Sequence, residues 1–158
     1  MKKTILYILV VANVIIISSC QYETDENKNS ITSKTNKQIE VSNAWMTPAA
    51  KNRNSAAYFT ITNNSNVSDT LFEVFSTLSQ LTELHETYKR TEGMLGMRSV
   101  DYIVVPSKEK FEFSPGGFHV MLIGLIKNLP IESSGEITLK FKVAGSLTIS
   151  VDCRLSQK

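Results

Sequence analysis

Two histidines and three methionines lie close together in this sequence. The window from His85 to Met121 covers 37 of the 139 residues from position 20 onward, yet it holds both histidines together with Met94, Met97 and Met121. His119 and Met121 are separated by one residue, so on a β-strand their side chains would project from one face and could reach one ion. Thioether sulfur is a soft ligand that favours Cu(I), and imidazole also binds copper. The window therefore predicts a copper site built from histidine and methionine.

Zinc fits this residue inventory less well than copper does. Structural zinc sites favour cysteine and histidine, and the chain has only two of each. Thiolates also bind Cu(I), but outside the cytoplasm they are prone to oxidation.

The competing interpretation of the cluster is that His119 is half-exposed on its strand and Met121 packs against a second layer. The chain would then be an interaction module in which the cluster has no metal role.

The stretch GGFHVMLIG around His119 is predicted to be a strand that is entered through a turn. Alternation assigns Phe118, Val120 and Leu122 to the core, and His119 and Met121 to the opposite, exposed face. The two glycines before this strand would let the backbone turn sharply. Two further glycines, at positions 93 and 96, would give the segment with Met94 and Met97 the freedom to bring in a thioether. The strand thus presents an imidazole and a thioether on one surface.

Short alternating segments bounded by Gly, Pro, Asn and Ser continue through the rest of the chain, and none has a long helical period. They read as strands at residues 56–63, 69–76, 101–105, 110–113, 118–124, 136–143 and 146–155. This pattern predicts an all-β fold, an antiparallel β-sandwich or a closely related barrel. Trp45 is expected to be a core residue of this fold.

The last two segments predict a hairpin that turns at Ala144-Gly145 or Gly145-Ser146. Alternation gives its inward-facing residues as Ile137, Leu139, Phe141, Val143, Leu147, Ile149, Val151, Cys153 and Leu155. Cys153 is therefore expected to be a small core residue and not a metal ligand.

The first nineteen residues have the order of a secretory leader. Two lysines are followed by an apolar run over residues 5–17, interrupted only by Asn13, and then by small residues and Cys20. This run is short for a membrane-spanning helix. The sequence ISSC resembles the lipobox of bacterial lipoproteins, which implies that Cys20 is lipidated and becomes the first mature residue. An uncleaved membrane anchor is the alternative.

Residues 20–38 contain few apolar side chains and are predicted to be a flexible tether between the lipid anchor and a β-domain at 39–158. Removing the leader subtracts two of the 17 Lys and Arg residues, which leaves 15 against 15 Asp and Glu. A net charge of zero gives no indication of a nucleic-acid partner. The protein is expected outside the cytoplasm, anchored on the periplasmic side of a bacterial membrane or at the cell surface.

Several motifs together resemble the PCuAC family of periplasmic copper(I) chaperones. The spacing of His85, Met97, His119 and Met121 matches the family pattern, in which a histidine and later a methionine are followed by His-x-Met. The surrounding segments NAW, SAAYFTITN, ELHE and SPGGFHVMLIGL agree with it, so the similarity covers essentially all of residues 39–155. The resemblance implies a cupredoxin-like β-barrel or sandwich.

The same resemblance implies the ligands and the role of the site. The implied Cu(I) ligands are His85, Met97, His119 and Met121, and the implied function is to carry copper to an acceptor, either a cytochrome c oxidase subunit or another copper chaperone. Family members often have methionine directly after the first histidine, where this chain has Glu86. Because that position varies, Glu86 is not expected to be a ligand. Met94 is a candidate auxiliary ligand, and a methionine packed beneath the site is the alternative.

Two other functional classes fit the sequence less well than a copper carrier. A blue-copper electron carrier needs two histidines and a cysteine with a weak axial methionine, and Cys153 is expected in the core with no histidine after it. An enzyme is disfavoured because neither GxSxG nor HExxH occurs and two histidines leave little for acid-base chemistry.

Overall fold

The structure is a computed structural model that describes residues 38–155. The predicted signal peptide, the lipidation site Cys20 and the predicted tether up to residue 37 lie outside the described residues. Within residues 38–155, no helix is long and apolar enough to cross a membrane. The elements in chain order are β1 (Ile39–Met46), β2 (Ser55–Asn63), β3 (Asp69–Phe75), β4 (Ser79–Lys89), the 3-10 helix η1 (Thr91–Gly93), β5 (Leu95–Ser99), β6 (Ile103–Val105), β7 (Lys110–Glu112), β8 (Phe118–Leu125), β9 (Ser134–Phe141) and β10 (Gly145–Cys153).

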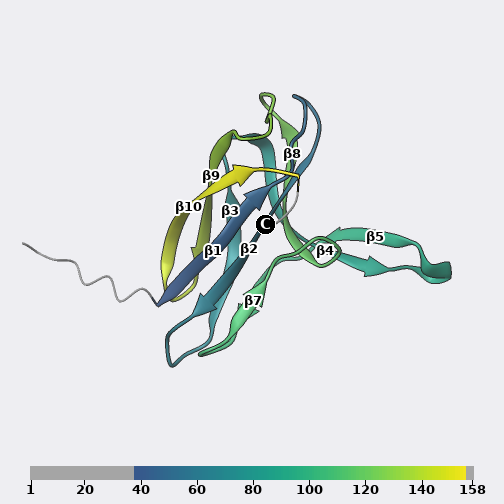
Figure 1. Cartoon of the computed structure of the whole chain (residues 1–158). Helices are drawn as coiled ribbons and strands as arrows, with labels where there is room; N and C mark the ends of the chain where they lie inside the picture. Colours follow the sequence, from purple (N-terminus) through teal and green to yellow (C-terminus); the bar gives the residue numbers. More distant parts are fainter. Residues whose placement is uncertain (1–37, 156–158) are drawn as a thin grey trace, which may run out of the picture. The chain divides into compact units, whose positions relative to one another are not determined.

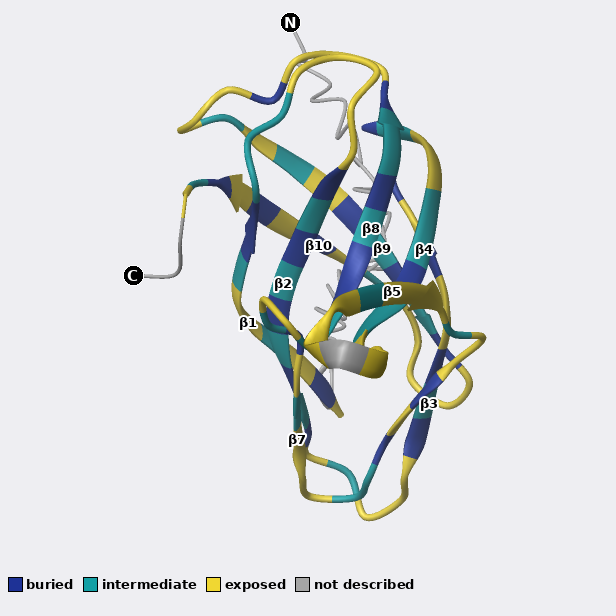
Figure 2. Cartoon of the chain, turned by 90° about the vertical axis from the view of Figure 1, so that its right-hand side faces the viewer, coloured by how far each residue is buried: buried dark blue, intermediate teal, exposed yellow. Residues whose placement is uncertain are grey.

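The strands form one continuous hydrogen-bonded sheet that folds into two layers. Their order is β5-β4-β8-β2-β1-β10-β9-β3-β6, and β7 pairs with β2 beside this path. Strand β1 joins the two layers. It runs antiparallel to β2 on one side and parallel to β10 on the other, at Trp45 and Met46. Figure 1 shows the path of the chain, and in Figure 2 β2, β8 and β4 face the viewer with β9 and β10 behind them. The predicted antiparallel β-sandwich is confirmed.

The core lies between the two layers and is built from alternate residues of each strand. Val120 and Leu122 on β8 are fully buried there, and Phe118 is half-buried and packs against the same cluster. The predicted core face of β8 is therefore confirmed. Cys153 on β10 is also buried in this cluster. Its burial raises the pKa of the Cys153 thiol and agrees with the predicted core position.

The closing hairpin forms, but its ends differ from the prediction. Gly145 pairs with Phe141, so the turn consists of residues 142–144 and contains Val143. Val143 and Leu155 are exposed, so their predicted core positions are wrong. The reason is that alternation holds only within a strand, and both residues lie beyond a strand end. The buried Asp69 accepts hydrogen bonds from the backbone N–H groups of Val143 and Ala144 and thereby holds this turn.

A second hairpin, formed by β4 and β5, extends beyond the body of the sandwich. β4 pairs with β8 from Ser79 to Glu86 and with β5 from His85 to Lys89, so the last three residues of β4 and their partners on β5 extend past the first residue of β8. Figure 1 shows this hairpin standing out from the layers, and Figure 2 looks onto its tip. The three strands β1, β4 and β5 are absent from the segments predicted from sequence.

Gly96 allows a close contact within this hairpin. A Cβ atom at Gly96 would lie 2.8 Å from Cζ of Tyr88, its partner on β4. The ring of Tyr88 covers the glycine, and the Arg98 guanidinium lies over the same ring at 5.1 Å. Gly96 therefore provides room for an aromatic ring, a role different from the predicted conformational freedom. Gly93 does have a left-handed φ of 79°, at the end of η1.

Candidate metal centre

Strand register brings both histidines together on the outer face of the layer that contains β2, β8 and β4. His85 on β4 lies directly opposite His119 on β8, and their ring centroids are 5.7 Å apart. Glu83 lies opposite Met121 in the same ladder. Opposed residues, and residues two apart along a strand, share a face of a sheet. The histidine and thioether side chains of β4 and β8 therefore project from one surface, as the alternation of β8 predicts.

Met97 reaches this surface from β5. It pairs with Thr87, which is two residues after His85 and therefore on the same face of β4. Met97, His119 and Met121 line one hollow of about 370 Å³, which Leu95 also borders. Three of the four predicted ligands thus share a cavity. The fourth, His85, lies beside the ring of His119. The structure brings together all four residues that the sequence singled out.

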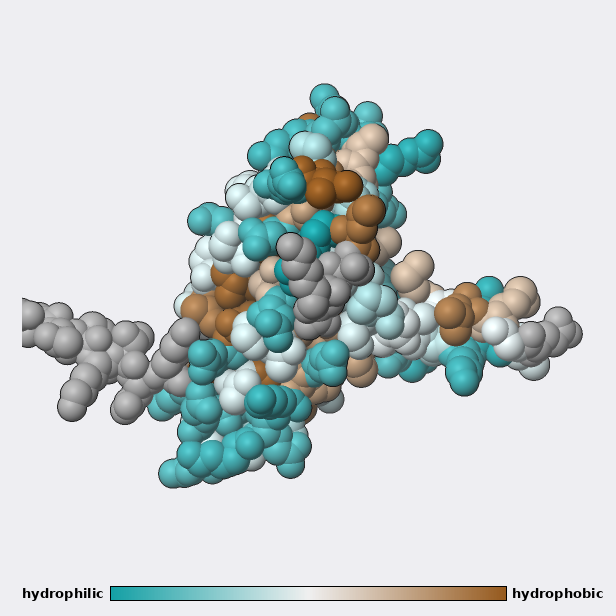
Figure 3. Space-filling model, viewed as in Figure 1, coloured by the Kyte–Doolittle hydropathy of each residue, from teal (hydrophilic) through white to brown (hydrophobic). Residues whose placement is uncertain are grey.

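Met97 is the most accessible of the four side chains, and His119 is the least accessible. Met97 is 58% exposed and Met121 is half-buried, whereas His119 is only 3% exposed. In Figure 3 the projecting hairpin carries hydrophobic surface, to which the exposed side chains of Met94, Leu95 and Met97 contribute. Met94 is 57% exposed and does not line the hollow, so it is not packed beneath the site.

The burial of His119 differs from the exposed position that the sequence predicts. A row of rings crosses the outer face of β1, β2, β8 and β4: Trp45 lies 4.7 Å from Tyr58, and Tyr58 lies 6.3 Å from His119. Trp45 is buried as expected, but it packs in this row and not in the main core cluster. Aromatic side chains of neighbouring strands, far apart in sequence, therefore cover a histidine that a single strand pattern would leave in solvent.

Each imidazole uses one nitrogen in a hydrogen bond within the protein. Nδ1–H of His119 donates to the carbonyl oxygen of Gly117 at 3.2 Å, and Nε2–H of His85 donates to Oε2 of Glu83 at 2.8 Å. The left-handed Gly116, with φ of 81°, forms the turn that presents the Gly117 carbonyl. The donor directions follow because carbonyl and carboxylate oxygens only accept.

The other two ring nitrogens fit a metal ion. Among residues 38–155, Nδ1 of His85 and Nε2 of His119 are buried and have no hydrogen-bond partner. A buried unsatisfied polar group costs about 1–3 kcal/mol, and coordination of a metal would relieve that cost. In the described part of the chain, no group of three His, Cys, Asp or Glu side chains is arranged to hold a metal. The cluster consists instead of two imidazoles and two thioethers, a soft donor set that suits Cu(I).

Glu86 lies on the opposite face of β4 from His85. Its carboxylate forms an ion pair with the guanidinium of Arg98, its partner on β5. This pairing agrees with the prediction that Glu86 is not a ligand. Sequence reasoning missed Glu83, although its position two residues before His85 on a strand could have placed it beside the ring.

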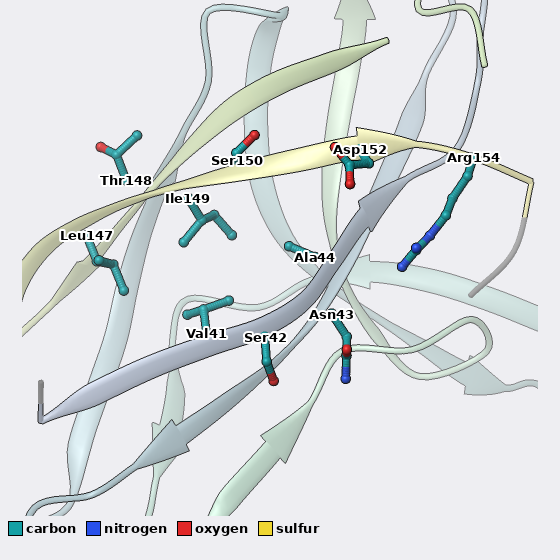
Figure 4. Close-up of a pocket in the computed structure, with 10 residues that line it drawn as sticks. All are labelled: Val41, Ser42, Asn43, Ala44, Leu147, Thr148, Ile149, Ser150, Asp152 and Arg154. Atoms are coloured by element: carbon teal, nitrogen blue, oxygen red, sulfur yellow. The ribbon is translucent and has the colours of Figure 1, made fainter. Parts of the chain in front are cut away.

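A larger groove than this hollow lies apart from the cluster. It has a volume of about 480 Å³ and opens between β1 and β10, where these strands diverge from their short parallel pairing. Figure 4 shows Val41 and Asn43 on one wall and Thr148, Asp152 and Arg154 on the other. Histidine, methionine and cysteine are absent from its lining, so its size does not make it the soft-metal centre.

The environment of His119 predicts how it titrates without metal. Burial lowers the pKa of His119; the hydrogen bond to Gly117 raises it, and the neighbouring His85 lowers it further, so that the pKa falls below the usual 6.5. Between pH 6.5 and this lower pKa, the unfolded chain binds a proton that the folded chain does not. The free energy of unfolding should therefore decrease as the pH falls through this window.

Nuclear magnetic resonance of the metal-free protein checks this expectation. The His119 ring signals should titrate with a midpoint below 6.5, and His119→Gln should reduce the loss of stability between pH 6.5 and that midpoint. A His119 midpoint at or above 6.5 would contradict the burial of its ring.

The chain has relatives among known sequences and solved structures. Residues 39–153 match the family described as "Putative lipoprotein LpqE-like". The "Putative lipoprotein Lxx21020" of Leifsonia xyli subsp. xyli (strain CTCB07) is 25% identical over 113 residues, which are 72% of this chain and 68% of the relative.

Two solved structures carry the same architecture. The apo PCuAC domain from PmoF1 is 25% identical with a TM-score of 0.64, covering 75% of this chain and 95% of that domain. The solution structure of CuI-DR1885 from Deinococcus radiodurans is 29% identical with a TM-score of 0.57, covering 78% of this chain and 85% of that protein. These matches confirm the predicted resemblance to PCuAC domains and the cupredoxin-like fold. By the match over residues 39–153, the chain belongs to the LpqE-like family.

Proposed function

We propose that this protein binds one Cu(I) ion through His85, Met97, His119 and Met121 and hands it to an acceptor protein. The observation that carries the proposal is the register of β4, β5 and β8, which puts these four residues on one surface. The similarity to CuI-DR1885, whose name includes Cu(I), supports the choice of metal. All four donors are neutral, so the site would hold a monovalent soft ion without the strong charge attraction that retains divalent metals.

The exposure of the four side chains suits transfer of copper. His119 is buried, His85 and Met121 are half-buried, and Met97 is exposed on the projecting hairpin. An acceptor could therefore replace the exposed thioether of Met97 first, before the less accessible imidazoles release the ion. This order of ligand exchange supports a carrier function and not catalytic turnover.

A blue-copper electron carrier does not fit this arrangement. Such a centre needs a cysteine thiolate beside two histidines. Cys153 lies within the core cluster, whereas His119 lies on the outer face of β8. We therefore favour carriage of Cu(I) over electron transfer.

The proposed acceptor is the copper centre of cytochrome c oxidase or another copper chaperone, as the PCuAC resemblance implies. The proposed location is the outer side of a bacterial membrane, with the domain held by lipidated Cys20 through a tether at 20–38. The lipoprotein names of the family and of the Leifsonia relative support this location. An interaction module without a metal role is the alternative, and it predicts no tight copper binding.

An anaerobic competition titration against a coloured Cu(I) chelator tests the proposal. The purified protein should withdraw one equivalent of Cu(I) from the chelator and show no intense blue colour after oxidation. A protein that leaves all the copper with the chelator would be the interaction module.

Matched methionine substitutions on the hairpin separate a ligand from a bystander. Met97→Leu removes a thioether that lines the hollow, whereas Met94→Leu removes one that does not. We expect Met97→Leu to weaken Cu(I) binding by about 10-fold or more, the range seen when metal sites lose a supporting interaction, and Met94→Leu to leave it unchanged. Equal losses in the two variants would show that the hairpin contributes general hydrophobicity and not a specific ligand.

A further inference from the structure

Glu83 is the charged side chain that contacts a histidine of the proposed site. Its Oε2 lies 2.8 Å from Nε2 of His85, two residues along β4. The side chain of His85 is 14% exposed and that of Glu83 is 35% exposed, so their contact is partly shielded from water. A partly shielded hydrogen bond to a carboxylate is stronger than one between neutral groups.

This contact determines which nitrogen of His85 is free. A carboxylate accepts hydrogen bonds, so Nε2 of a neutral His85 carries the hydrogen and Nδ1 carries the lone pair. The contact of His119 has the opposite sense, because the Gly117 carbonyl engages Nδ1 and leaves Nε2. The two nitrogens left without partners are buried, Nδ1 of His85 and Nε2 of His119. The two rings therefore present different nitrogens.

We propose that Glu83 is a positioning residue that holds His85 in the tautomer whose Nδ1 binds copper, while His119 binds through Nε2. This inference rests on the proposed function and adds a residue outside the four-ligand set. Metal-bound histidines commonly donate their second N–H to a carboxylate, which fixes the ring and makes the ligating nitrogen more basic. Here that carboxylate is supplied by the same strand as the histidine.

Glu83 acts through His85 and not as a copper ligand. Carboxylate oxygen is a hard donor that suits Mg²⁺, Ca²⁺ and Mn²⁺ better than Cu(I). Its Oε2 is already engaged by the imidazole. Its cross-strand partner Met121 supplies a thioether on the same surface. The soft donors nearby are therefore better matched to Cu(I) than the carboxylate is.

Long-range proton–nitrogen correlation on histidine-labelled protein tests the tautomers directly, because Cu(I) is diamagnetic. In the metal-free protein at neutral pH, His85 should show a protonated Nε2 and His119 a protonated Nδ1. Addition of one equivalent of Cu(I) should shift Nδ1 of His85 and Nε2 of His119. A Cu(I)-induced shift that is larger at Nε2 of His85 than at its Nδ1 would overturn the inference.

Three substitutions on β4 test the role of Glu83 itself. Glu83→Ala should produce a mixture of His85 tautomers and weaken Cu(I) binding by about 10–100-fold, the usual cost of losing such a partner. Glu83→Gln keeps an oxygen acceptor and should retain the tautomer. Glu86→Ala is the matched control, because Glu86 is on the same strand but pairs with Arg98 on the opposite face. It should change neither the tautomer nor the affinity, since a surface ion pair contributes little.

The outcomes separate this inference from the proposed function. If the unsubstituted protein binds no Cu(I), the proposed function fails. If it binds Cu(I) but Glu83→Ala leaves both the tautomer and the affinity unchanged, only the role of Glu83 fails. Thermal unfolding of each variant verifies that the half-exposed positions tolerate substitution, so that a loss of affinity reports on the ring and not on the fold.

Discussion

The double substitution His119→Ala/Met121→Ala is expected to weaken Cu(I) binding by more than about 100-fold, because loss of a supporting residue alone costs about 10–100-fold. It removes one buried imidazole and one thioether that line the same hollow. Competition against a coloured Cu(I) chelator under anaerobic conditions measures the change. The fold should persist, since Val120 and Leu122 on the core face of β8 remain in place.

Ile123→Ala provides a matched control for this variant. Ile123 is half-buried, lies two residues after Met121 on the same face of β8 and pairs with Leu81 on β4. Its truncation removes apolar bulk from the outer face without removing a nitrogen or sulfur donor. Copper affinity equal to that of the unsubstituted protein is expected for Ile123→Ala. Retention of tight Cu(I) binding by the double variant would show that β8 supplies no copper ligand.

Asp69→Ala is expected to lower the free energy of unfolding by at least about 3 kcal/mol, because hydrogen bonds to charged groups contribute about 1.5–3 kcal/mol each and the substitution removes several of them. The buried carboxylate of Asp69 accepts from the backbone N–H groups of Thr70, Val143 and Ala144. It thereby connects the start of β3 to the turn between β9 and β10. Denaturant unfolding at neutral pH measures the loss.

Two companion variants define the origin of that loss. Asp69→Asn keeps one oxygen acceptor and should lose less stability than Asp69→Ala. Asp152→Ala removes an exposed carboxylate from β10 and should change the stability by less than about 0.5 kcal/mol, as surface substitutions usually do. The Cu(I) affinity of Asp69→Ala should stay unchanged, because β3 lies outside the site. A stable Asp69→Ala variant would show that the turn does not depend on this carboxylate.

Alternation along single strands was sufficient to predict the sandwich. Val120 and Leu122 in β8, and Leu139 and Val151 in the closing hairpin, occupy the core faces that the pattern assigned to them. Strand β4 escaped prediction because its pattern is weak, with Leu84 buried but Leu81 50% exposed. Strand β5 escaped because its side chains are mostly exposed on the projecting hairpin, so no apolar alternation marks it.

The four candidate ligands were implied by the resemblance to PCuAC proteins, whose pattern their types and spacing match, but their surroundings could not be predicted. The pairing of His85 with His119, and of Thr87 with Met97, depends on a register between strands that no single segment encodes. The row of rings that buries His119 draws Tyr58 from β2, far away in sequence. Because of these long-range contacts, His119 is buried and Met121 is half-buried, although the strand pattern placed both on an exposed face.

X-ray absorption spectroscopy of the Cu(I)-loaded protein tests the central claim most directly, because it reports the atoms bound to copper. We predict mixed coordination by nitrogen and sulfur, with two imidazole nitrogens and two thioether sulfurs, and loss of sulfur scattering when Met97 and Met121 are both replaced by leucine. Coordination by nitrogen and oxygen alone, or sulfur scattering that survives both substitutions, would contradict a copper site made of His85, Met97, His119 and Met121.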